Sequence, residues 1–327
     1  MTSRFPLKIV KDLLVLQDKP SKLKNRIPPG LKNQLKIYKY NIWLLYADLS
    51  RTRQLGFRAV IAALRKKRKR VVFFPDPPWQ NAVIYQICLE NGYRIAHYPC
   101  QAFDFAIKWK NDTSHQMYPV LHEISKTHPV INLNCNDISK SCVDAAFQEI
   151  FGYGISIDPT SYHGKCVEKS IFNGRHDATI IDCPIAKAKP HYVYQLLVDN
   201  RIDDERVMDM RVPIFKDRIP FVIVFYKPVD RRFANFHFHG DNYQFYDTDR
   251  IFSPQEQANI LFFCCRLGMD YGELDILRHR PDGRIFIVDA NNTPDGPPIS
   301  VGLDGNDLRT QTLHLRAEAF AEVFDHN

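Results

Sequence analysis

The sequence predicts an α/β lobe followed by an α+β region. Residues 70–98 have the pattern of strand, helix and strand within about thirty residues, which is typical of a βαβ unit in a parallel sheet. Beyond residue 164 strand patterns dominate, with two helical patterns among or after them. The length of 327 residues is more than one hydrophobic core usually needs, so we expect two or three lobes.

Positive charge is concentrated at the N-terminal end of the chain. Residues 1–70 hold nineteen lysines and arginines against three aspartates, whereas the rest of the chain holds twenty-five basic and thirty-four acidic residues. This asymmetry indicates either an anionic surface partner for residues 1–70 (nucleic acid, phospholipid or acidic glycan) or a well-solvated basic lobe. Residues 41–65 place apolar side chains on a helical period, which favours a helix packed on its own domain over one lying on a membrane.

The composition excludes several classes of protein. With 45% hydrophobic and 25% charged residues, the chain is neither disordered nor collagen-like. Its longest apolar runs fall short of the roughly 20 residues that cross a bilayer. Because its start also lacks a signal-peptide pattern, we expect a cytoplasmic protein without a transmembrane segment. The eight cysteines fit neither a zinc knuckle nor a disulfide framework.

Local patterns predict the individual elements. The first lobe should contain strands at 70–74 and 93–98 around a helix at 81–90. A strand at 128–133 should lead to a helix at 137–151, which Asp137 or Ser139 can cap. Later strands are expected at 166–168, 178–181, 192–198, 206–212, 221–226, 271–277 and 284–289, with helices at 253–266 and 307–324.

The residues with the clearest chemistry lie on the predicted hairpin at 271–289. Glu273 and Asp275 share a face of its first strand because side chains alternate, and Asp289 lies two residues before Asn291 on the second strand. Closing the hairpin brings Asp275 opposite Asp289 and Asn291. Two carboxylates and an amide oxygen are hard ligands that suit Mg²⁺, so we predict a magnesium site here.

This hairpin, with its Asp-Ala-Asn-Asn-Thr-Pro exit, resembles the metal-binding end of the ATP-grasp superfamily. The resemblance covers about residues 125–327 and implies ATP and Mg²⁺ as cofactors. It implies that Lys140, at the start of a helix, is the first ATP lysine. Lys169 matches the second ATP lysine best, with Lys165 as the competing candidate. The implied domains are 1–128, a basic helical segment with an α/β lobe, and 129–327, a two-lobed ATP-grasp fold divided at about residue 198.

Two further segments match the superfamily in order along the chain. The loop at 172–178 stands where a phosphate-covering loop is expected, so Asn173 can offer its backbone N–H and Arg175 its charge to phosphate. Residues 194–197 resemble the hinge that binds adenine, with Gln195 where the family often has Glu and Leu197 at its end.

One position departs from the family pattern. Many ligases of the superfamily have an arginine two residues before the first metal aspartate, where this chain has Glu273. Either Glu273 joins the metal site or another cation supplies the missing charge. We favour Arg211 on its strand as the catalytic cation, together with Lys227; the remaining candidates are Arg231, Arg232 and Arg278.

The resemblance implies a ligase that activates a substrate carboxylate as an acyl phosphate, which an amine or another nucleophile then attacks. The alternatives are an ATP-grasp phosphotransferase and a non-catalytic protein that binds an anionic polymer or membrane surface. The expected partner is a small or anionic carboxylate acceptor. The sequence identifies neither that acceptor nor the oligomeric state.

Overall fold

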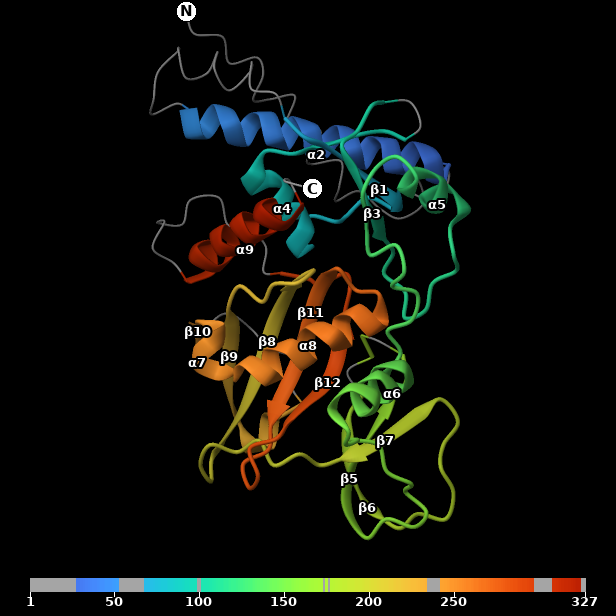
Figure 1. Cartoon of the computed structure of the whole chain (residues 1–327), viewed down its shortest axis with the longest axis vertical. Coiled ribbons are helices and arrows are strands. Elements are labelled where there is room, and N and C mark those ends of the chain that lie inside the picture. The colour runs from blue at the N-terminus through green and yellow to red at the C-terminus, as the bar shows by residue number, and fades with distance from the viewer. Residues whose placement is uncertain are drawn as a thin grey trace, which may run out of the picture.

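The computed structural model describes residues 28–52, 68–98, 101–172, 174–175, 177–233, 242–296 and 308–324. This part of the chain contains a four-stranded parallel sheet and two antiparallel sheets, of three and five strands. Figure 1 shows the parallel sheet among helices at one end of the molecule and the two antiparallel sheets at the other. The predicted α/β lobe followed by α+β lobes is therefore confirmed.

The N-terminal lobe contains the predicted βαβ unit. Its strands lie in the order β2-β1-β3-β4 and all run parallel. They are β1 (Arg70–Pro75), β2 (Arg94–Ile95), β3 (Phe105–Trp109) and β4 (Val130–Ile131). Helix α4 (Val83–Asn91) connects β1 to β2 and ends at Gly92, whose φ of +71° is the left-handed conformation that glycine adopts readily.

Helix α2 (Pro29–Thr52) lies across this lobe (Figure 1). It begins twelve residues before the predicted start at residue 41, because Pro29 suits the first turn of a helix. Tyr40 and Leu44 are buried in the lobe's core, and the Tyr40 hydroxyl donates to the carbonyl of Tyr93 at 2.8 Å. The helix therefore packs on its own domain, as predicted. Residues 1–27 and 53–67, with most of the basic cluster, lie outside the described residues.

Sequence patterns missed five elements of the described residues. These are strand β3, helix α5 (Pro119–Ser125), the 3₁₀ turn Val229–Arg231, strand β10 (Asn242–Tyr246) and the short helix α7 (Thr248–Ile251). All five residues of β3 are buried, including Lys108, whose ammonium donates to the carbonyl of Cys135 at 3.0 Å. A strand buried on both faces is recognised by a continuous apolar run, and Lys108 interrupts that run.

The small antiparallel lobe carries helix α6 (Lys140–Phe151) beside its sheet. Its strands are β5 (Gly164–Ser170), β6 (Thr179–Cys183) and β7 (Tyr192–Leu196), in the order β6-β5-β7. Ser139 caps α6 by accepting a hydrogen bond from the backbone N–H of Cys142. Asp137, the other predicted cap, instead accepts from the backbone N–H of Ser139 at 2.7 Å. The cap leaves Lys140 as the first residue of the helix.

The large lobe is an antiparallel sheet in the order β10-β9-β8-β11-β12. Its other strands are β8 (Arg206–Phe215), β9 (Val222–Pro228), β11 (Tyr271–Arg278) and β12 (Ile285–Asn291). Helix α8 (Pro254–Leu267) covers one face of the sheet (Figure 1), and the short helix α7 (Thr248–Ile251) precedes it. The predicted hairpin is thus confirmed as β11 and β12. No helix of the described residues is long and apolar enough to cross a membrane.

Helix α9 (Leu308–Phe324) packs against both the N-terminal lobe and the large lobe. Its Phe320 is fully buried, with ring contacts to Phe105 and Tyr93 of the N-terminal lobe and to Tyr271 and Phe215 of the large lobe. The C-terminal helix is therefore packed where the N-terminal lobe meets β11.

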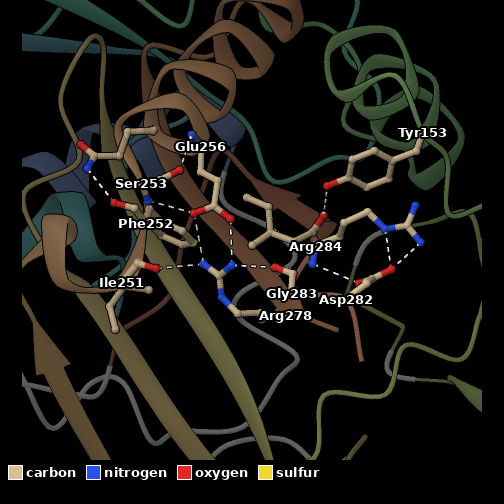
Figure 2. A network of polar contacts seen from close by, with 11 residues as sticks. Tyr153, Ile251, Phe252, Ser253, Glu256, Arg278, Asp282, Gly283 and Arg284 are labelled. Atoms are coloured by element: carbon tan, nitrogen blue, oxygen red, sulfur yellow. Dashed lines mark hydrogen bonds and ion pairs between the residues drawn. The ribbon is translucent and has the colours of Figure 1, made fainter. Parts of the chain in front are cut away.

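A network of polar contacts holds the turn of the β11–β12 hairpin against α8 (Figure 2). The guanidinium of Arg278 donates to Glu256 at 2.8 Å and to the carbonyls of Gly283 and Ile251 at 2.7 and 2.8 Å. Glu256 also closes a capping box with Ser253 at the start of α8. Arg278, one of the candidate catalytic cations, is thus engaged in supporting the hairpin.

Replacing Arg278 with methionine should destabilise the protein without changing nucleotide binding. The change removes the Arg278 donor from two carbonyls and leaves the partly buried Glu256 with only its capping-box hydrogen bond, which we expect to cost about 1–3 kcal/mol. Urea denaturation measures the stability, and calorimetric titration with Mg-ADP measures the affinity of the folded protein. A loss of affinity at unchanged stability would mean that Arg278 acts in the site after all.

Candidate functional site

Polar side chains gather on the face of the large sheet that α8 does not cover. Alternate side chains of β8 and β11 enter the core beneath α8; they include Met210, Val212, Leu274 and Ile276. Because side chains alternate along a strand, the residues between them emerge on the opposite face. These are Asp209, Arg211, Glu273 and Asp275.

The predicted metal-binding residues are in register across the hairpin. Asp275 pairs with Asp289, and Glu273 pairs with Asn291, in the ladder of β11 and β12. The register shifts immediately after Asp275. The amide oxygen of Asn291 accepts from the backbone N–H of Thr293 at 3.0 Å, which fixes its orientation.

Both predicted ATP lysines reach this hairpin from the small lobe. The ammonium of Lys140 lies 3.0 Å from a carboxylate oxygen of Asp289, and that of Lys169 donates to the carbonyl of Val288 at 3.0 Å. Lys165 instead points outward and pairs with Asp182 at 3.2 Å; both side chains are largely exposed. Of the two competing lysines on β5, only Lys169 lies with the other site residues.

Burial strongly affects the charge of Lys169. Desolvation and then the neighbouring Lys140 lower the pKa of its ammonium to about 8, although Asp289 and Asp144 oppose the shift. A multiply charged anion would stabilise the ammonium form of Lys169, because its attraction offsets the cost of desolvation. The site therefore favours a ligand such as phosphate near Lys169.

Nucleotide affinity should accordingly fall as the pH is raised above 8. Only the ammonium form of Lys169 attracts phosphate, so bound nucleotide raises the pKa of Lys169. The protein therefore takes up a proton when it binds nucleotide above pH 8. We expect a loss of up to about tenfold per pH unit above 8. Calorimetry of Mg-ADP binding at pH 7.0 and 9.5 measures it, and Lys169→Met is the control. If that variant showed the same pH dependence, another group would be titrating.

Arg211 lies between two carboxylates of the neighbouring strand. Its Nε is 3.1 Å from Asp275 and 3.8 Å from Glu273, and its guanidinium lies over the ring of Phe225. Asp275 and then Glu273 raise the pKa of Arg211 above its already high value, so the group is always charged. It thus places a fixed cation beside the predicted metal ligands.

Lys227, the second candidate catalytic cation, is engaged with Asp209. Its ammonium lies 2.6 Å from that carboxylate, and both side chains are mostly buried. Burial raises the pKa of Asp209 despite this ion pair. Arg232 donates at 2.8 Å to the carbonyl of Val198, which lies in the segment that connects the small and large lobes. Arg231 ends a short 3₁₀ turn (Val229–Arg231).

The predicted hinge residue Gln195 contacts the small lobe's own helix. Its side-chain amide donates to Asp144 at 2.6 Å, and Ser156 donates to the other oxygen of the same carboxylate at 2.5 Å. Burial raises the pKa of Asp144. Leu197 is the first residue beyond β7. Sequence patterns missed Asp144, although it follows Lys140 by one helical turn.

The predicted phosphate-covering loop is only partly described. Arg175 is exposed, with its guanidinium 6.0 Å from the centre of the Phe172 ring. Asn173 lies outside the described residues. The role of this loop therefore stays a prediction.

The donor set on the hairpin fits Mg²⁺. Asp275, Asp289 and Asn291 offer only hard oxygens, which Mg²⁺ prefers, and each carboxylate already lies beside a cation that a divalent metal can replace. Among the described residues, no group of three or more His, Cys, Asp or Glu could hold a metal. Two carboxylates and one amide require no such group, because Mg²⁺ commonly takes waters and phosphate oxygens as its remaining ligands.

No protein-family model and no curated protein matches the chain. Solved structures of low identity match most of it. The ATP-grasp ligase PsnB, complexed with a precursor variant, Mg and ADP, has a TM-score of 0.47 and 10% identity over 77% of this chain and 99% of its own. The macrocyclase MdnC from Microcystis aeruginosa, bound to precursor peptide MdnA, has values of 0.44 and 11% over 79% and 100%. D-alanine–D-alanine ligase from Bacillus anthracis has 0.44 and 12% over 79% and 95%.

Proposed function

We propose that this protein is an ATP- and Mg²⁺-dependent ligase of the ATP-grasp type. One observation carries the proposal: two lysines of the small lobe reach the second strand of the hairpin, Lys140 at the carboxylate of Asp289 and Lys169 at the carbonyl of Val288. Arg211 binds Asp275 on the first strand, opposite Asp289. Three cations and two carboxylates thus converge from five elements. Such a set suits a magnesium–triphosphate complex, because phosphoryl transfer depends mainly on positioning and on neutralising charge.

The resemblance to the ATP-grasp pattern assigns a role to each predicted site residue. Lys140 and Lys169 would bind phosphate oxygens, with Arg175 and the backbone of Asn173 closing over them. Asp275, Asp289 and Asn291 would hold Mg²⁺, which neutralises charge on the phosphate oxygens when bound. Arg211 would stabilise charge on the transferred phosphoryl group, and Lys227 would support the same face through Asp209. Leu197 and Gln195 would frame the adenine.

The reaction we propose begins with attack of a substrate carboxylate on the γ-phosphate. The bond between the γ-phosphorus and the β–γ bridging oxygen breaks, so ADP leaves and an acyl phosphate forms. Attack by an amine or another nucleophile on the acyl carbon then breaks the bond from the acyl carbon to the phosphate oxygen and releases phosphate. The acceptor would be a small or anionic carboxylate. The surplus of positive charge in residues 1–70 would raise its association rate or hold the enzyme at an anionic surface.

Product analysis with Mg-ATP and cell extract tests this function. The ligase predicts ADP and free phosphate in equal amounts, together with a product that contains one new amide or related bond. A phosphotransferase would instead leave a stable phosphorylated product without free phosphate. Salt-sensitive binding to anionic polymers or vesicles, with no nucleotide turnover, would contradict both enzymes.

A further inference from the structure

Helix α9, at the C-terminal end of the described chain, carries a buried arginine that contacts the candidate site. Arg316 of α9 lies 2.5 Å from Glu273 of β11, with only 10% and 6% of the two side chains exposed. Its guanidinium lies over the ring of Phe221, and its Nε is buried without a hydrogen-bond partner. A buried arginine with an unsatisfied donor is costly, so this placement needs a reason.

The contact extends a chain of alternating charges across the site. In order, it runs from Arg316 to Glu273, then to Arg211 and to Asp275. Arg316 occupies one oxygen of Glu273, and the other oxygen is 3.8 Å from Arg211, beyond hydrogen-bond distance. The shorter contact of Arg211, at 3.1 Å, is therefore with Asp275.

We propose that Arg316 is a positioning residue: by binding Glu273, it leaves Arg211 on Asp275 and withholds the Glu273 carboxylate from the metal. Without Arg316, Glu273 would be a buried carboxylate whose nearest cation is Arg211, and it would draw that guanidinium away from Asp275. Glu273 would also become an extra hard ligand beside Asn291, its partner in the ladder. This inference rests on the proposed function of the site.

The contact between Arg316 and Glu273 depends on how α9 packs against the other lobes. Phe320, one turn beyond Arg316, is packed among rings of both the N-terminal and large lobes. The backbone carbonyl of Ala317 accepts from Asn91 of α4 at 2.8 Å. Arg316 is thus held by the N-terminal lobe while it acts on the large sheet.

A set of substitutions tests the proposal. Arg316→Gln should lower kcat for ATP turnover by about tenfold or more while changing the KM for ATP less, since it displaces Arg211 but not the phosphate-binding lysines. Arg316→Gln combined with Glu273→Gln should recover most of kcat, because no unpaired carboxylate then remains. In an Arg211→Met background, Arg316→Gln should lower kcat no further. The control is Glu322→Gln on the same helix, which removes the exposed contact of Glu322 with Arg218 of the β8–β9 turn.

Manganese(II), followed by electron paramagnetic resonance without nucleotide, gives a readout independent of turnover. Arg316→Gln should bind it several-fold more tightly than wild type, and the double variant should return to the wild-type affinity. Additive losses of kcat with Arg211→Met, together with unchanged manganese affinity, would overturn the proposal and leave Arg316 a stabilising residue only. Failure of the proposed function looks different: wild type itself would neither bind Mg-ADP nor turn over ATP.

Discussion

Replacing Asp289 with asparagine should abolish ATP turnover while leaving the protein folded. Asp289 is in register with Asp275 on the hairpin and lies 3.0 Å from Lys140, so one carboxylate is placed to serve both the predicted metal and the lysine proposed to bind phosphate. Losing a metal-binding carboxylate forfeits several kcal/mol of charge stabilisation, which corresponds to about 1,000-fold or more in rate. Steady-state phosphate release at saturating magnesium measures the effect.

A matched control lies on the same hairpin. Asp282 stands at the turn, where it contacts His279 and Arg284 at the end opposite the site. Asp282→Asn should retain turnover, because it changes only the turn. Thermal unfolding of both variants separates loss of fold from loss of chemistry. Ordinary turnover by Asp289→Asn at ordinary magnesium concentration would show that the metal assignment is wrong.

Local patterns predicted the elements that carry the candidate site. The Pro-Asp-Gly turn and the alternation of acids with apolar residues were enough to place Asp275 opposite Asp289. Asp137 and Ser139 were both possible caps for the helix predicted at 137–151, and in the structure Ser139 caps α6, which begins at Lys140. These features depend on neighbours a few residues apart, so a single sequence contains them.

The contacts between distant elements could not be predicted in this way. Arg278 and Arg211 were both candidate cations on predicted strands, yet Arg278 supports the turn through Glu256 and Arg211 binds Asp275, a predicted metal ligand. Arg316 meets Glu273 only because α9 is packed between two lobes. Whether an arginine is structural or functional depends on which partner the tertiary fold supplies, and composition or spacing does not encode that directly.

The second large effect should separate the two lysines of β5. Lys169 and Lys165 are four residues apart and share a face by alternation, so the sequence alone ranked them only by resemblance. In the structure Lys169 is partly buried and its ammonium binds the carbonyl of Val288, while Lys165 is exposed and pairs with Asp182. Lys169→Met should therefore weaken Mg-ADP binding by about 30–150-fold, the value of a charge-assisted hydrogen bond to phosphate, and Lys165→Met by no more than about twofold.

Stability should move in the opposite direction from affinity. Lys169 is a desolvated cation next to Lys140, so a methionine of similar length removes an electrostatic cost and should keep or raise the unfolding midpoint. A folded Lys169→Met protein with much weaker nucleotide binding then shows that the lysine is present for its ligand. Isothermal titration with Mg-ADP and thermal unfolding of wild type and both variants measure the two effects. Equal affinities of the two variants would remove Lys169 from the phosphate site, and with it the alignment of β5 to the ATP-grasp pattern.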